Sequence, residues 1–74
     1  MTTLEHITRN PSIMGGKPCI RGTRITVEHI LRKLGEGLTI EQVLADHPRL
    51  KLEDIYAAER FAADYLANEE IAFG

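Results

Sequence analysis

Apolar residues recur at helical spacing through the second half of the chain, and this pattern predicts three helices. We expect them over residues 27–36, 40–47 and 52–68. The apolar stripe of the first consists of Val27, Ile30, Leu31 and Leu34. Thr26 is the expected N-cap of this helix, and Thr39 with Gln42 matches the capping box of the second. Pro48 disfavours helical geometry at His47 and ends the second helix.

The predicted third helix is apolar on more than one side, because Tyr56, Phe61 and Tyr65 lie beyond its main stripe. A helix of this kind usually packs on two neighbours, and one of them can belong to another subunit. Its acidic side chains are expected to be exposed: Glu53, Asp54, Glu59 and Asp64. Lys51 stands where an N-cap oxygen is expected, so the start of this helix is weakly specified.

Residues 4–25 are predicted to be extended, because prolines and glycines interrupt any helical period. Gly15-Gly16 signals a turn, and Gly22 separates residues 19–21 from 23–25, which predicts two short strands or one bent strand. The helices are spaced compatibly with helix-turn-helix packing. The sequence therefore predicts one mainly α domain with a short N-terminal β-arm or hairpin. Its expected parts are the β-arm (1–25), the three-helix bundle (26–68) and the C-terminal tail (69–74).

The chain has 74 residues, of which 43% are hydrophobic and 27% charged. This composition is that of a small globular domain and excludes a disordered tail, a collagen-like repeat and a disulfide scaffold. A domain this small has marginal stability, so we expect its apolar surface to be shared in a homodimer. No apolar run approaches the ~18 residues of a membrane span, and no signal-peptide pattern opens the chain. With a single cysteine, Cys19, we expect a protein of the reducing cytoplasm.

The formal net charge is −2, but the charges are unevenly distributed along the chain. Residues 1–34 carry a net charge of +4, and residues 35–74 carry −6. Such an asymmetry indicates two surfaces with different partners. The alternative is a chance division of charge in a short chain.

The segment from Gly15 to Ile25 combines glycines with three cations, which predicts a loop and strand that contact phosphates. It is not a nucleotide-binding P-loop, because Pro11 and Pro18 stand at two required positions. The candidate nucleic-acid-binding residues are Lys17, Arg21, Gly22, Thr23 and Arg24. The alternative is a hairpin whose arginines are solvated or paired with acidic residues.

Aromatic and apolar residues of the third helix and the tail are the candidate contacts to a partner protein. They are Tyr56, Phe61, Tyr65, Ile71 and Phe73. For the last two, the alternative is a frayed end without a binding role.

The chain shows no pattern typical of catalysis. Ser12 is the only serine, and Cys19 has no histidine at a predictable position. The three histidines lie on separate elements without metal-ligand spacing. We therefore expect a protein that is not an enzyme, with no metal, cofactor or small-molecule substrate.

Two motifs closely resemble the signatures of the bacterial family called domain of unknown function 433. The first is Asn10-Pro11-x-Ile13-x-Gly15-Gly16-Lys17-Pro18-x-Ile20-Arg21-Gly22-Thr23-Arg24-Ile25-x-Val27. The second is Leu44-x-x-His47-Pro48-x-Leu50-x-x-Glu53-Asp54-Ile55. The resemblance extends from about Ile7 to Tyr65, and its first motif is the more specific of the two.

The resemblance implies a homeodomain-like three-helix domain, of helix-turn-helix type, with an N-terminal β-arm. It also implies a VapB-type antitoxin that neutralises a PIN-like ribonuclease toxin and binds operator DNA. Two features depart from the family pattern, namely Lys51 before the third helix and the acidic character of that helix. The alternatives are a stand-alone DNA-binding regulator and a non-catalytic dimeric interaction module.

Overall fold

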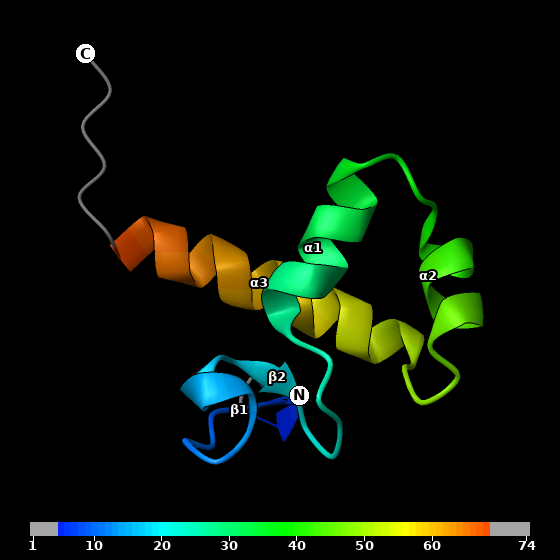
Figure 1. Ribbon diagram of the computed structural model, residues 1–74. Helices are drawn as coiled ribbons and strands as arrows, with labels where there is room; N and C mark the ends of the chain where they lie inside the picture. The colour runs from blue at the N-terminus through cyan, green and yellow to red at the C-terminus, as the bar shows by residue number, and fades with distance from the viewer. Residues whose placement is uncertain (1–4, 69–74) are drawn as a thin grey trace.

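The computed structural model describes residues 5–68 and shows three helices beside a short antiparallel strand pair (Figure 1). The elements in chain order are β1 (Ile7–Thr8), the 3-10 turn η2 (Met14–Gly16), β2 (Cys19–Ile20), α1 (Val27–Gly35), α2 (Ile40–Asp46) and α3 (Leu52–Asn68). The predicted mainly α fold with an N-terminal β-arm is therefore confirmed. Within residues 5–68, no helix combines the length and the apolarity that crossing a membrane requires.

The helices α1 and α2 start where their capping residues predict. The Thr26 hydroxyl accepts a hydrogen bond from the His29 backbone N–H at 3.1 Å. At α2 the capping box is complete, because Thr39 accepts from the Gln42 N–H at 3.1 Å and the Gln42 side chain accepts from the Thr39 N–H at 2.8 Å. The first two helices end one residue earlier than predicted, at Gly35 and Asp46.

The core lies where α1, α2 and the strand pair meet α3. Its buried residues are Ile7, Ile20, Val27, Ile30, Val43, Leu50, Ile55, Ala57 and Ala58. Because Ile7 and Ile20 belong to the two strands, the arm is part of the core and not an appendage. One face of the N-terminal half of α3 is buried here, with Asp54, Ile55, Ala57 and Ala58, whereas the C-terminal half of the helix extends past α1 (Figure 1).

The strand pairing differs in part from the two strands expected on either side of Gly22. Only Cys19–Ile20 forms a strand there, and its partner is Ile7–Thr8, with Ile7 opposite Ile20. Residues 23–25 form no strand but return through a tight turn at Gly22, whose φ is +80°, and the chain then pairs with β2 at a single antiparallel bridge between Cys19 and Thr26. The Thr23 hydroxyl holds this turn, because it donates to the Ile20 carbonyl at 2.8 Å and accepts from the Ile25 N–H at 3.0 Å.

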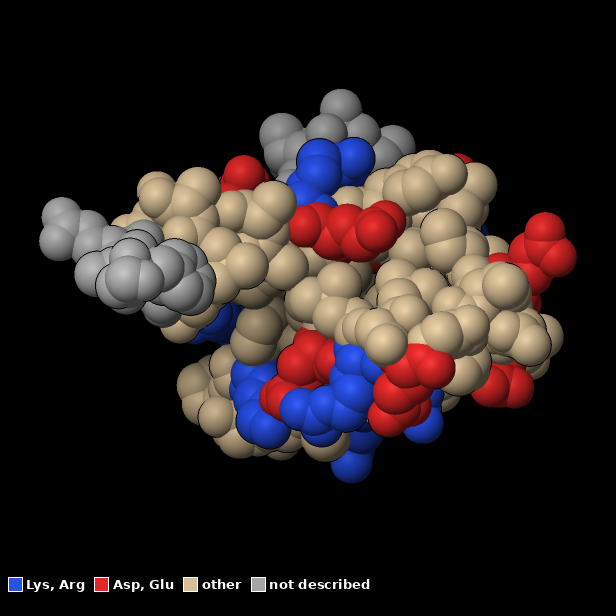
Figure 2. All heavy atoms as spheres, turned by 90° about the horizontal axis from the view of Figure 1, so that it is seen from above, with Lys and Arg blue, Asp and Glu red and all other residues tan. Residues whose placement is uncertain are grey.

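The charge asymmetry along the chain does not produce two single-sign faces on the side shown in Figure 2. There, basic and acidic side chains lie against one another in mixed clusters beside a broad surface of other residues. The structure contains ion pairs of this kind, since Glu28 contacts Lys17 and Arg32, and Lys33 contacts Glu36. Opposite charges along α1, and between the arm and α1, therefore neutralise each other over short distances.

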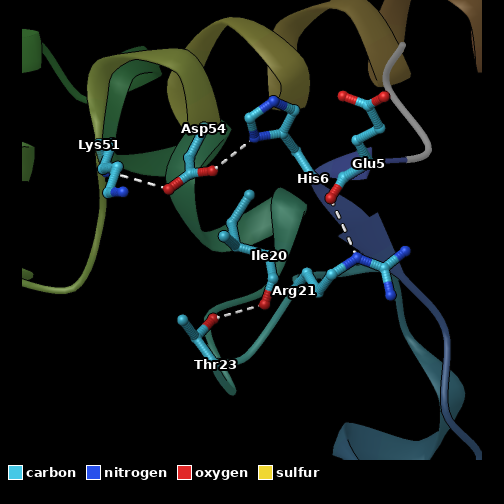
Figure 3. A network of polar contacts seen from close by, with 7 residues as sticks. All are labelled: Glu5, His6, Ile20, Arg21, Thr23, Lys51 and Asp54. Atoms are coloured by element: carbon cyan, nitrogen blue, oxygen red, sulfur yellow. Dashed lines mark hydrogen bonds and ion pairs between the residues drawn. The ribbon is translucent and has the colours of Figure 1, made fainter. Parts of the chain in front are cut away.

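Asp54 is buried, at 8% exposure, and the expectation that it would be exposed on the third helix is wrong. Its carboxylate accepts two hydrogen bonds, from the His6 ring Nδ1–H at 2.9 Å and from the Lys51 backbone N–H at 3.0 Å (Figure 3). The second bond caps α3 from inside its first turn, which explains how Lys51 can precede the helix without a capping side chain. The first ties the arm to α3 across 48 residues of sequence.

We predict that Asp54→Ala destabilises the fold by about 2 kcal/mol, because it removes both a helix cap and the hydrogen bond from the His6 Nδ1–H. Urea or thermal unfolding measures this difference. Glu59→Ala, which removes an exposed carboxylate from the same helix, should change the free energy of unfolding by less than about 0.5 kcal/mol. Equal effects of the two substitutions would contradict the anchoring role of Asp54.

We also predict that Cys19 is protected from thiol reagents in the folded state. The side chain is 1% exposed, its Sγ lies 3.4 Å from the Lys17 carbonyl oxygen, and burial raises the pKa of the thiol. Ellman's reagent should therefore react about a hundredfold more slowly with the native protein than with the urea-unfolded chain, because attack requires local opening. Similar native and unfolded rates would show that β2 is not held in the core.

Candidate functional site

Lys17 follows η2 and is engaged in an ion pair. Its Nζ lies 2.6 Å from Oε1 of Glu28 on α1, and Arg32 Nη2 lies 3.6 Å from the other carboxylate oxygen. The hydrogen bond and charge of Lys17 hold the pKa of Glu28 below its usual value, with a smaller contribution from Arg32. Lys17 therefore links the arm to α1.

Arg21 also has contacts within the fold. Its Nε–H donates to the Glu5 carbonyl oxygen at 3.0 Å (Figure 3). Its backbone N–H donates to the His6 carbonyl oxygen at 2.7 Å. Gly22 and Thr23 form the turn that follows. A contact of these three residues with nucleic acid stays a prediction, and each has a local role in holding the arm.

Arg24 differs from the other two predicted cations. It is exposed and has no hydrogen bond or ion pair within residues 5–68. It lines a hollow together with Arg49, from the loop between α2 and α3. Arg49 belongs to the half of the chain with a net negative charge. No local sequence pattern predicts that residues 24 and 49 lie at the same hollow.

A second hollow lies between the arm, α1 and the C-terminal half of α3, and we call it the α1–α3 groove. Its volume is about 480 Å³. It is lined by Arg9, Pro18, Val27, Glu28, Leu31, Phe61, Ala62, Tyr65 and Leu66. Most of these residues are apolar, and Tyr65 and Leu66 are 50% and 55% exposed.

The structure brings Phe61 and Tyr65 together in this groove. Their rings stack with centroids 6.4 Å apart and planes inclined by 20°. The Arg9 guanidinium carbon lies 5.8 Å from the Phe61 ring centroid, within the range of a cation–π contact. Arg9 was missed at the sequence level, whereas the four-residue spacing of the two aromatic residues is itself a signal that they share a helix face.

The other residues predicted to bind a partner lie elsewhere. Tyr56 is 45% exposed on α3 but does not line the α1–α3 groove. Ile71 and Phe73 fall outside the described residues.

The three histidines make two different kinds of contact. His6 donates to Asp54, and the rings of His29 and His47 meet edge to face with centroids 5.3 Å apart. Among residues 5–68, no group of three His, Cys, Asp or Glu side chains is placed to hold a metal ion.

We predict that Lys17→Ala shifts the titration of the Glu28 carboxyl to higher pH, because the variant removes the main cause of its lowered pKa. In the native protein the pair is fully formed above the ordinary pKa of a glutamate and is lost as the pH falls through the lowered value. Carbon-13 NMR of the side-chain carboxyl measures the midpoint. Arg32→Ala should give a smaller upward shift, and the reverse order would contradict the assignment.

A family model and a solved structure both relate this chain to the same protein family. The family model described as "Protein of unknown function (DUF433)" matches residues 7–62. A crystal structure of a DUF433 member protein from Anabaena variabilis is similar with a TM-score of 0.80 and 31% identity, covering 84% of this chain and 61% of that one. This match supports the helix arrangement and the arm together.

A curated relative is the uncharacterized protein y4eO of Sinorhizobium fredii, 35% identical over 71 residues. The match covers 95% of this chain and 32% of the relative, so the chain spans about a third of that protein's length. The family model and the crystal structure lead to the same conclusion: this chain belongs to the DUF433 family of proteins of unknown function.

Proposed function

We propose that the protein is an antitoxin-like binding module whose α1–α3 groove binds a partner protein, a PIN-like ribonuclease, and inhibits it. The observation that carries this proposal is the groove itself. Tyr65 and Leu66 are half exposed on the part of α3 that extends past α1, beside the half-buried Phe61. Contiguous apolar surface with aromatic residues is typical of protein-binding sites.

The shape of the groove supports an inserted side chain as its occupant. Leu31 and Val27 of α1 form one wall, and Phe61 and Ala62 of α3 form another. A volume of about 480 Å³ is enough for one or two large apolar side chains of a partner. Burial of such anchors supplies most of the binding free energy at many interfaces.

The charges beside the groove favour a basic partner. Helical spacing places Glu59 next to Ala62 and Asp64 next to Phe61, and both carboxylates are exposed. A nuclease that binds RNA needs a positively charged surface around its substrate. The acidic positions of α3 are complementary to such a surface and would compete with the phosphates of RNA.

The resemblance of the two sequence motifs to the signatures of this family supports the same role, because it implies an antitoxin paired with a PIN-like ribonuclease. A stand-alone DNA-binding regulator has less support from the geometry, because Lys17 and Arg21 are engaged within the fold and α3 is acidic. A homodimer would cover the same apolar groove with a second copy. Sedimentation tests the homodimer, and binding to oligonucleotides at different salt concentrations tests the DNA-binding regulator.

We predict that the protein co-purifies with the product of the neighbouring gene when the two are expressed together, and that it suppresses that product's ribonuclease activity. Tyr65→Ala and Leu66→Ala should each weaken the complex about tenfold or more, as expected for anchor residues. Calorimetry on the purified components measures affinity, and cleavage of a labelled RNA measures inhibition.

Leu52→Ala is the matched control for Leu66→Ala, because it makes the same change at an exposed position of the same helix but outside the groove. It should leave the affinity nearly unchanged. A neighbouring product that neither binds nor cleaves RNA would remove the antitoxin proposal. Sedimentation of the chain alone identifies the dimer alternative, which requires a dimer that Leu66→Ala dissociates.

A further inference from the structure

The hollow that Arg24 and Arg49 line shares no residue with the α1–α3 groove. We call it the Arg24–Arg49 groove, and its volume is about 530 Å³. It is lined by Thr8, Ile13, Gly22, Thr23, Arg24, Ile25 and Arg49. These residues come from β1, from the turns on either side of β2, and from the loop between α2 and α3.

The two arginines differ from most other cations of this protein. Lys17, Arg32 and Lys33 have carboxylate partners, Arg21 donates to a backbone carbonyl, and Arg9 lies over Phe61. Arg24 and Arg49 are both exposed, and neither has a hydrogen bond or an ion pair within the described residues. No carboxylate is among the described residues that line their groove.

The fold holds both arginines at this groove through tight turns next to buried residues. Arg24 follows the turn at Gly22, which the Thr23 hydroxyl fixes through its bonds to Ile20 and Ile25. Arg49 precedes Leu50, which is 6% exposed and whose N–H donates to the His47 carbonyl oxygen at 2.9 Å. The backbone is therefore set before any ligand binds, which lowers the entropic cost of binding.

The remaining lining suits a ligand with a charged part and an apolar part. Ile13 and Ile25 are half-buried, and Ile25 packs against the core. The Thr8 hydroxyl adds a hydrogen-bonding group with no partner in the described part of the chain. Guanidinium groups bind phosphate oxygens with paired hydrogen bonds, and the groove is far larger than one phosphate requires.

We propose that the Arg24–Arg49 groove binds the phosphodiester backbone of a nucleic acid, with the two guanidinium groups on phosphates and a sugar against the isoleucines. This inference goes beyond the proposed function, because it does not depend on the α1–α3 groove. It also moves the nucleic-acid contact away from Lys17 and Arg21 and adds Arg49, a residue from the acidic half of the sequence.

Fluorescence anisotropy with end-labelled single-stranded and duplex oligonucleotides, over a series of KCl concentrations, tests the proposal. The wild type should bind, and its affinity should fall with added salt. Arg24→Gln and Arg49→Gln should each reduce the slope of log K against log salt by about 0.7 for single strands or about 0.9 for duplex. The double variant should lose about twice as much slope.

Arg60→Gln is the matched control, because Arg60 is exposed on α3, has no partner in residues 5–68 and does not line the groove. It should leave both affinity and slope nearly unchanged. No binding by the wild type at the lowest salt, or equal losses for Arg60→Gln and the groove variants, would overturn the proposal.

A titration with inorganic phosphate, followed by amide NMR shifts of Thr23, Ile25 and Leu50, separates the two sources of phosphate. Shifts with inorganic phosphate but no binding of oligonucleotides would reassign the groove to a free phosphate and overturn the nucleic-acid proposal. The groove variants should still bind the partner protein as the wild type does. Failure of the nucleic-acid proposal is therefore distinguishable from failure of the antitoxin proposal.

Discussion

The fold depends on the docking of its N-terminal arm against the helices. Ile7 and Ile20 are buried with the helical core, and the His6 ring donates to the buried carboxylate of Asp54. A chain of 74 residues has few apolar side chains to bury, so two isoleucines are a considerable share of its core. The hydrogen bond from His6 also fixes the orientation of the arm on α3, because the Asp54 carboxylate accepts from His6 and from Lys51 at the same time.

Both candidate surfaces follow from this docking. Arg9 and Pro18 of the arm complete the α1–α3 groove, and Thr8, Ile13 and the turn at Gly22 form most of the Arg24–Arg49 groove. Without the docked arm, neither hollow would have its second wall. Loss of the Asp54 anchor would therefore weaken stability and both proposed binding sites together, whereas surface substitutions in one groove should leave the other intact.

Local charge pairing explains why the net charge of each half of the chain is a poor guide to the charge of the surface that this half forms. The basic N-terminal half contains Glu28, which neutralises Lys17 and lies near Arg32. The acidic C-terminal half contributes Arg49 to a hollow with no carboxylate among its described lining residues. Interactions between exposed charges are screened beyond about 8–10 Å. The charge of a surface therefore depends on which charged side chains are neighbours in the fold, more than on the net charge of a segment of the sequence.

The sequence by itself determined the three helices, the N-caps of the first two, the bend at Gly22 and the shared face of Phe61 and Tyr65. These features depend on residues at most four positions apart, where backbone geometry relates sequence to space directly. Only the tertiary structure decided that Ile7–Thr8 pairs with Cys19–Ile20, that Asp54 is buried, and that Arg24 and Arg49 share a groove. These depend on how the arm packs across α3 and beside the loop after α2, and no short-range periodicity carries that information.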